Sequence, residues 1–133
     1  MARATALVAA LLTAACLDTP TSPDAAIGRP FELRAGATVA VSGGLTIKFG
    51  AVRSDSRCPM DAICVWAGEA TVALSVMASS GGPETRDLST MPGSSAVDYA
   101  AYRISLTGLS PYPRASQQIR PGDYVATLVV TTR

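Results

Sequence analysis

From residue 30 onward, apolar and polar residues alternate over several short stretches, a pattern typical of β-strands that bury one face. TVAV at residues 38–41 and LTIKF at residues 45–49 alternate on either side of the turn sequence SGG, which predicts a β-hairpin. One face of this hairpin carries Val39, Val41, Leu45, Ile47 and Phe49. We expect that face to contact a hydrophobic core, because side chains two residues apart point the same way in a strand.

The same alternation recurs in EATVALSVM at residues 69–77, YRISL at 102–106 and DYVATLVVTT at 123–132, with a shorter run in RDLST. The stretch at 123–132 is apolar on both faces, which favours an interior position in a sheet. Turn sequences rich in glycine and proline separate the stretches, and SAVDYAAY suggests one helical turn. We predict an all-β fold, a small β-sandwich or open barrel of about six to seven antiparallel strands.

The first residues follow a different pattern, that of an export signal. Arg3 precedes an apolar run at residues 4–12, and small residues follow at 13–15. The run is shorter than the roughly 20 apolar residues that a membrane-spanning helix needs. We therefore predict a signal peptide at residues 1–15, a flexible tether at 16–29, where proline, serine, threonine and aspartate recur without periodicity, and a single β domain at 30–133.

LTAAC at residues 12–16 resembles the lipobox of bacterial lipoproteins, in which the chain is cleaved just before the cysteine and the cysteine is acylated. Thr13 stands where the lipobox usually has leucine. The resemblance implies that Cys16 carries lipid and anchors the protein to a membrane of the bacterial cell envelope, with the domain facing the periplasm or the exterior. The alternative is an ordinary signal peptide cleaved near Ala15, which would leave Cys16 as a terminal thiol.

The charges of the chain are balanced. It has 11 basic and 10 acidic residues, and removing Arg3 with the signal peptide leaves 10 basic residues against 10 acidic ones. A neutral, interspersed charge pattern provides no electrostatic reason to expect nucleic acid as a partner, and no polybasic patch for anionic lipid. The predicted partners are thus a membrane, through the lipid anchor, and a protein of the envelope.

The chain contains no histidine. This removes the usual general base near neutral pH, the serine–histidine and cysteine–histidine nucleophilic systems, and histidine-based zinc sites. The sequence also lacks a phosphate-binding loop, a dinucleotide-binding fingerprint and a G-x-S-x-G motif. We therefore expect a protein that is not an enzyme and that needs no cofactor.

The segment DSRCPMDAICVWAGEA, residues 55–70, holds Cys58 and Cys64 and the single tryptophan, Trp66. With Cys16 acylated, Cys58 and Cys64 form an even pair in an oxidising compartment, which predicts a disulfide. Their spacing is not C-x-x-C, and a zinc site would need further ligands. We expect Trp66 to pack in the core against the disulfide, with ligand stacking as the alternative.

Carboxylates in and near this segment allow a calcium hypothesis, because Asp55, Asp61 and Glu69 are all oxygen donors. Calcium wants about six to eight oxygens, however, and the spacing is not that of an EF-hand. Capping of turns or pairing with Arg53 and Arg57 is the simpler expectation. A carboxylate-based enzyme would require Asp55, Asp61, Glu69 and Asp123 to gather around a cleft.

The same segment resembles one that recurs in uncharacterised bacterial lipoproteins and secreted proteins, with the form D-S-R-C-P followed by C-x-W-x-G-x-A. YRISLTGLSPYP and DYVATLVV further along the chain are also similar to that group. The resemblance supports export and the disulfide, and it implies no catalytic residues. Residues of the segment that we select as a contact surface are Asp55, Arg57, Pro59, Asp61 and Trp66.

Together these features predict a lipid-anchored envelope protein that acts as a non-catalytic binding or structural module. Another hypothesis is an exported protein that resembles a protease inhibitor and uses the cross-linked loop as a wedge.

Overall fold

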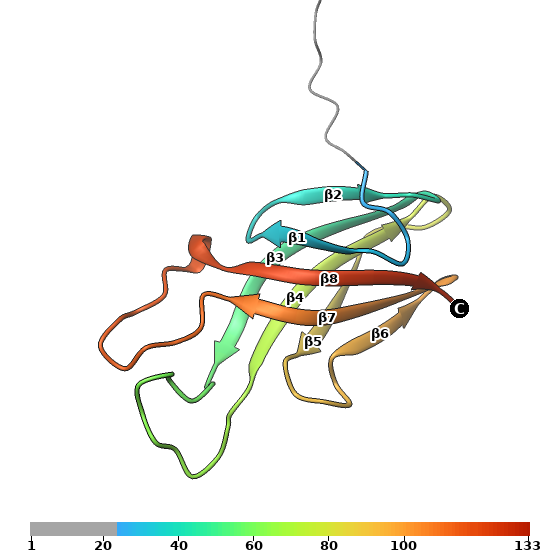
Figure 1. Cartoon of the computed structure of the whole chain (residues 1–133). Helices are drawn as coiled ribbons and strands as arrows, with labels where there is room; N and C mark the ends of the chain where they lie inside the picture. Colours follow the sequence, from blue (N-terminus) through green and yellow to red (C-terminus); the bar gives the residue numbers. More distant parts are fainter. Residues whose placement is uncertain (1–23) are drawn as a thin grey trace, which may run out of the picture.

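A computed structural model describes residues 24–133, which form two antiparallel four-stranded sheets packed face to face (Figure 1). One sheet has the order β2-β3-β4-β5 and the other β1-β8-β7-β6. The strands are β1 (Pro30–Arg34), β2 (Thr38–Val41), β3 (Leu45–Asp55), β4 (Ala70–Ala78), β5 (Glu84–Ser89), β6 (Ala96–Tyr99), β7 (Tyr102–Ser110) and β8 (Val125–Thr132), and a short 3₁₀ turn, η1 (Pro121–Asp123), precedes β8. The all-β prediction is confirmed as a sandwich, with eight strands where about six to seven were expected.

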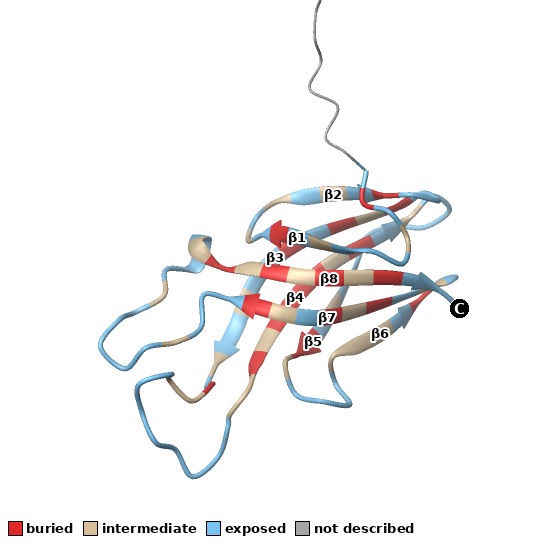
Figure 2. Cartoon of the chain, in the orientation of Figure 1, coloured by how far each residue is buried: buried red, intermediate tan, exposed pale blue. Residues whose placement is uncertain are grey.

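The predicted hairpin is formed by β2 and β3, in which Val39 pairs with Ile47 and Val41 with Leu45. Alternate side chains of β3 are buried in the core, Phe49 completely. The last strand, β8, lies between β1 and β7, as its two apolar faces indicated. Figure 2 shows buried positions recurring between more exposed ones along the strands of both sheets. Alternation therefore predicted these strands correctly, because a period of two places every second residue on one face.

The helical turn expected within residues 95–102 is wrong. This stretch contributes β6, which pairs with β7 so that Val97 lies opposite Ile104 and Tyr99 opposite Tyr102. Ala100, with φ +51°, makes the turn between the two strands. Tertiary pairing with a regular neighbour overrides the weak helical preference of the alanines.

The tether prediction is wrong for its last six residues, 24–29. Ala25 is only 7% exposed and lies beside β2, where its N–H donates to the Ala40 carbonyl at 2.9 Å and its carbonyl accepts from the Ser42 N–H at 3.0 Å. The N–H of Gly28 donates to the Val130 carbonyl at 2.7 Å. The two bonds of Ala25 satisfy backbone groups of β2, an edge strand, and the bond of Gly28 continues the pairing of β1 with β8. The signal peptide, Cys16 and the rest of the tether lie outside the described residues.

The two ends of the sandwich differ in what they carry. Ala25 and the C-terminal Arg133 both lie near the turns at the start of β3 and β7, which we call the termini end (Figure 1). The segment joining β3 to β4, residues 56–69, projects from the opposite end and is called the disulfide loop. The 11 residues of β3 separate the two ends, a span of roughly 35 Å at about 3.3 Å per residue.

Candidate functional site

The disulfide loop begins as a narrow neck that extends the pairing of β3 with β4. The N–H of Ser56 donates to the Glu69 carbonyl and that of Cys58 to the Ala67 carbonyl, both at 2.7 Å. The hydroxyl of Ser56 donates to the Glu69 carbonyl at 3.0 Å and accepts from the Glu69 N–H at 3.1 Å. Gly68 has φ +68°, and a Cβ at this position would collide with the Ser56 carbonyl. Only glycine therefore fits the neck.

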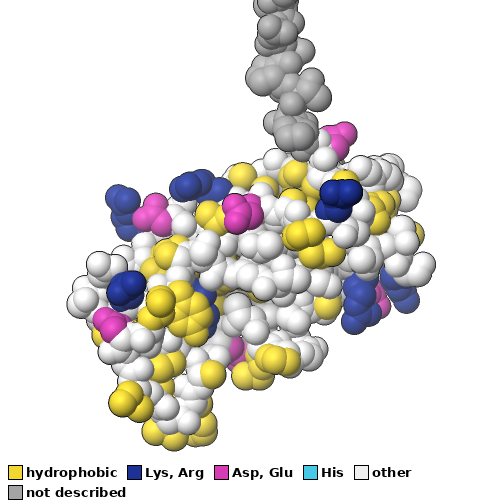
Figure 3. All heavy atoms as spheres, in the orientation of Figure 1, with side chains coloured by type: hydrophobic (Ala, Val, Ile, Leu, Met, Phe, Trp, Pro, Cys, Tyr) yellow, Lys and Arg dark blue, Asp and Glu magenta, His cyan; other side chains and the backbone are white. Residues whose placement is uncertain are grey.

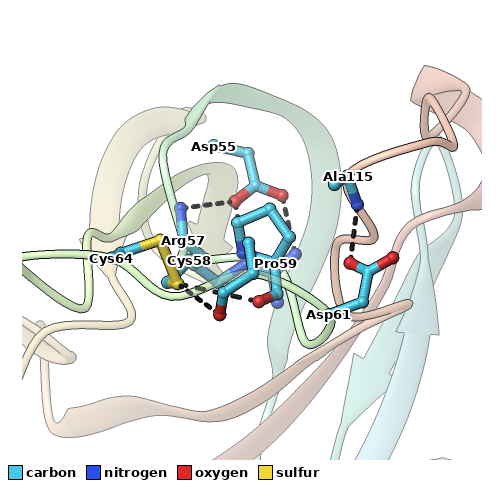
Figure 4. The surroundings of a disulfide bond; sticks show 8 residues. Asp55, Arg57, Cys58, Pro59, Asp61, Cys64 and Ala115 are labelled. Atoms are coloured by element: carbon cyan, nitrogen blue, oxygen red, sulfur yellow. Dashed lines mark hydrogen bonds and ion pairs between the residues drawn. A yellow bond between two sulfur atoms is a disulfide. The ribbon is translucent and has the colours of Figure 1, made fainter.

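Beyond the neck, the loop is cross-linked. The predicted disulfide between Cys58 and Cys64 is present, with the two Cα atoms 5.9 Å apart (Figure 4). Between the two cysteines, the N–H of Ala62 donates to the Pro59 carbonyl at 3.1 Å and closes a tight turn. The disulfide and this turn restrict the conformations available to the tip.

A nearly buried ion pair lies under the loop. Arg57 donates to Asp55 from Nε at 2.8 Å and from a terminal nitrogen at 2.7 Å, so both carboxylate oxygens are engaged. The side chains of Arg57 and Asp55 are only 5% and 10% exposed. Tyr124, from the opposite sheet, donates its hydroxyl to Asp55 at 3.0 Å. Bidentate geometry and a third donor compensate for taking the two charges out of water.

The guanidinium of Arg57 also reaches the end of β7 and the segment that follows it. It donates to the Leu109 carbonyl at 2.7 Å and to the Pro111 carbonyl at 3.0 Å. It lies over the Tyr112 ring, 4.9 Å from the centroid, at a distance suited to a cation–π interaction. One side chain thus joins the base of the disulfide loop to the second sheet.

These contacts change the acid–base properties of the pair. Burial raises the pKa of Asp55, but hydrogen bonds from the Arg57 side chain, the Tyr124 hydroxyl and the Arg57 N–H, together with the Arg57 charge, lower it by more, so the net pKa lies below its ordinary value. The pKa of Tyr124 is raised by burial and by its hydrogen bond to the Asp55 carboxylate. The site therefore favours an ionised Asp55 and a protonated Tyr124.

A second set of contacts ties the loop to residues 111–120. The N–H of Met60 donates to the Pro113 carbonyl at 3.0 Å. The Asp61 carboxylate accepts from the Ala115 N–H at 2.8 Å (Figure 4), and this hydrogen bond holds the pKa of Asp61 below its ordinary value. Asp61 is therefore engaged within the molecule although it lies at the surface.

The five residues selected from the sequence as a contact surface divide into two groups. Asp55 and Arg57 form the nearly buried ion pair, and Arg57 also lines the groove described below, so neither side chain projects from the tip. Pro59 is half-buried, and Asp61 and Trp66 are exposed. The expectation that Trp66 packs in the core is wrong, because Trp66 is 81% exposed. Among the described residues, Trp66 is not part of the core cluster.

Trp66 is not alone, because bulky apolar side chains collect at this end of the molecule. Seven large apolar side chains are exposed among the described residues. Six of the seven belong to the disulfide loop and to the two segments next to it: Met60, Ile63, Val65, Trp66, Met91 and Tyr112. Figure 3 shows apolar side chains at the tip of the molecule far from the termini end. We call these six residues the apolar rim.

A groove opens beside the rim. Its volume is about 570 Å³, and its walls include Ala67 and Gly68 of the loop, Met91, Leu109 and Tyr112. Its polar groups are largely occupied. The guanidinium at its base is engaged in the contacts described above, and the Thr90 hydroxyl accepts from the Ala70 N–H at 2.9 Å. The groove therefore suits an uncharged apolar group.

The carboxylates considered for calcium or catalysis do not gather. Asp55 pairs with Arg57, Asp61 with a backbone N–H, Glu69 with the Ser89 hydroxyl, and Asp123 with Arg120 at 2.9 Å. Within residues 24–133 there is no group of three or more cysteine or carboxylate side chains placed to hold a metal ion. The carboxylate-based enzyme and the calcium domain therefore lose the arrangement on which they depended.

Several residues of the site were missed in the sequence. Tyr124 was assigned only to a core strand, and Met91, Leu109 and Tyr112 were assigned to turns or strands without a role. Leu109 lies 52 positions after Arg57, and Tyr124 lies 69 positions after Asp55. No local pattern connects residues so far apart. The one local signal in the sequence is that Asp55 and Arg57 stand two positions apart, directly before Cys58, so that they could pair with each other.

None of the helices in residues 24–133 has the length and apolar character needed to cross a membrane. No family profile, curated protein or solved structure matches the chain.

Proposed function

We propose that the protein is a lipid-anchored module of the bacterial cell envelope that binds a partner through its disulfide end and catalyses no reaction. The observation that carries the proposal is the apolar rim. Monomeric proteins rarely expose large contiguous apolar patches, and such patches mark interaction sites. Here two residues of the rim, Met91 and Tyr112, also line a groove of the same character.

The frame behind the rim supports this proposal, because binding costs less when a surface is already ordered. The loop is cross-linked by the disulfide, narrowed at Gly68, and held to the opposite sheet through Arg57 and Asp61. These restraints keep the rim ordered before a partner binds.

The position of the described N-terminal end, opposite the disulfide loop, also supports the proposed binding role. The described chain starts at the termini end, so a tether leading to an acylated Cys16 would leave the domain there. The disulfide end would then project away from the anchoring bilayer and remain accessible to a protein partner.

Site-specific photo-crosslinking in the envelope tests the proposal. A photoreactive phenylalanine analogue is placed at position 66 in the full chain, and at position 77 as the control. Met77 is also an exposed apolar residue, but it lies near the end of β4, away from the rim. We expect crosslinked protein species from position 66 and none from position 77. Equal crosslinking at both positions, or none at either, contradicts the proposal.

The anchor is tested separately. Intact-mass analysis of the exported protein should show a chain that begins at Cys16 and carries acyl groups. A mature chain with an unmodified terminus would contradict the lipid anchor and leave the binding surface unaffected.

Inhibition of a protease is a second candidate, favoured by the consecutive exposure of Ile63, Cys64, Val65 and Trp66 in a cross-linked loop. Incubation with representative serine, cysteine and metalloproteases distinguishes it. An inhibitor lowers protease activity stoichiometrically, and Ile63→Ser abolishes that effect, whereas a simple docking module leaves the activities unchanged.

A further inference from the structure

We propose that the occupant of the groove is a second copy of this chain, with Trp66 of each copy inserted into the groove of the other. The inference deepens the proposed function, on which it rests, by naming the partner of the apolar rim. A twofold dimer uses the same patch on both subunits, so the patch has to be complementary to itself. The disulfide end meets this condition in shape and in charge.

The shape of the disulfide end provides both halves of such an interface. Trp66 projects from the loop, 81% exposed, and it is not part of the wall of its own groove. The groove starts directly beside it, at Ala67 and Gly68. A volume of about 570 Å³ lies within the roughly 300–1,000 Å³ of pockets that hold small organic molecules, a range that includes space for an indole ring. In a dimer with twofold symmetry, the contact between Trp66 of one copy and the groove of the other occurs twice.

The groove wall also suits an indole chemically. Met91 and Tyr112 offer a thioether and an aromatic face, both of which pack favourably on aromatic rings. The indole N–H can only donate, and the Thr90 oxygen, which accepts from the Ala70 N–H, keeps a second lone pair to accept from it. Aromatic side chains inserted in desolvated pockets are the residues that most often dominate interface energies.

Charge does not oppose the approach of two identical ends. Asp61 is the only charged residue from Cys58 to Ala67, and it is engaged by the Ala115 N–H. The charge of Arg57 is neutralised by Asp55 within the same subunit. Arg114, in the segment that follows Tyr112, lies close enough to Asp61 to attract its carboxylate. The charges at this end therefore balance within each subunit, and two copies can bring their rims together without a large net repulsion.

The position of the termini leaves this interface free. The described chain starts about the length of β3 away from the loop, near the turn that precedes β3. Neither a tether nor an anchor that continues from residue 24 starts in the space a second copy would occupy. The termini end therefore does not obstruct the interface.

Trp66 itself reports on the contact, because it is the only tryptophan of the chain. The experiment uses the full exported chain carrying Cys16→Ser, so that no acyl group drives association. Fluorescence emission and sedimentation are measured from about 1 µM to about 1 mM protein, a range that covers weak dimers. We expect the sedimenting mass to double, with an emission shift to shorter wavelength over the same concentrations.

Three variants locate the interface. Trp66→Ser removes the inserted ring, and its association is measured by sedimentation alone, because the fluorophore is gone. Met91→Asp places a charge in the groove, and its association is measured by both fluorescence and sedimentation. We expect each to weaken dimerisation by at least about thirtyfold, the loss typical of a buried aromatic anchor. Met77→Ser removes an equally exposed apolar residue elsewhere and should leave dimerisation unchanged. Thermal unfolding of all three verifies that the fold is intact.

A chain that stays monomeric over the whole range overturns the inference. An emission shift without a change in mass also overturns it, because Trp66 would then occupy its own groove. If a blue shift requires phosphatidylcholine vesicles, the occupant is a membrane. If position 66 crosslinks to a different protein while the chain is monomeric, the proposed function stands and self-association fails. If position 66 crosslinks to nothing, both fail.

Discussion

Ile47 and Ile63 have the same side chain, yet Ile47 of β3 is fully buried and Ile63 of the disulfide loop is 104% exposed. The same contrast holds between the aromatic residues Phe49 and Trp66, at 0% and 81%. In the sandwich, each apolar face has an opposing sheet to pack against. In the loop, the disulfide and polar contacts hold the backbone, and apolar burial contributes little. The backbone of this molecule is therefore held in two ways. Core packing leaves a polar surface, whereas the cross-link and polar contacts of the loop leave an apolar one.

This comparison has a functional consequence. A core orders a segment by hiding its apolar side chains, so those side chains cannot contact a partner. Cross-linking and ion pairing order a segment while leaving its apolar side chains in water. The disulfide end thus combines a restrained backbone with accessible apolar groups, a combination that reduces the entropy cost of binding.

The largest expected effect tests the contrast directly. Phe49→Ala should lower the free energy of unfolding by about 3–5 kcal/mol, because it leaves a cavity between the two sheets. Trp66→Ala should change it by less than about 0.5 kcal/mol, as expected for an exposed position. Denaturant unfolding of the two variants measures both. A loss above about 2 kcal/mol for Trp66→Ala would mean that the loop stabilises the fold through this ring.

An effect of similar size is expected where the two regions join. Arg57→Ala removes one partner of a nearly buried pair and leaves Asp55 uncompensated, at a cost of about 3–5 kcal/mol. The control is Arg53→Ala, since Arg53 pairs with Asp87 at 2.9 Å while both side chains are about half exposed. That pair should contribute less than about 1 kcal/mol. Equal losses in the two variants would contradict the joining role of Arg57.

The neck of the loop should be sensitive at a single glycine. Gly68→Ala forces a side chain into a backbone with φ +68° and against the Ser56 carbonyl. We expect a loss of about 2–4 kcal/mol in the free energy of unfolding. Gly82→Ala is the matched control, because Gly82 has an ordinary φ and open space around it. If both variants are as stable as the wild type, the neck is less restricted than its geometry indicates.

The smallest expected effect is the pH dependence from Asp55. The pKa of Asp55 is lower in the folded protein than in the unfolded chain. Its stabilising contribution is therefore complete above its unfolded pKa of about 3.9 and is lost as the pH falls through the folded value. Unfolding free energies measured from about pH 7 to about pH 2 should decrease less steeply for Asp55→Asn than for the wild type. Parallel pH profiles would assign the acid sensitivity to other carboxylates.

Alternation predicted the strands that have a regular apolar face, above all β2, β3 and β8. It failed at β6, where pairing with β7 decides the conformation of a short alanine-containing stretch. It also placed the end of the tether too late, since Ala25 is held by the edge of β2. In both cases the deciding hydrogen bonds come from residues distant in the sequence.

The disulfide was predicted from the number of cysteines, together with the expectation of an oxidising compartment. The position of Trp66 was not, because an aromatic residue next to a disulfide in a β protein is ordinarily covered by a neighbouring strand. Its exposure depends on how far β3 and β4 extend past the opposite sheet.

The sequence alone determined the all-β class, the hairpin and the disulfide, because these depend on side-chain period, turn residues and the number of cysteines. Only the tertiary structure decided which apolar residues are covered. It brought Arg57 into contact with Leu109 and Tyr112 and left Trp66 in water, because burial depends on the presence of an opposing layer and not on the hydrophobicity of the residue itself.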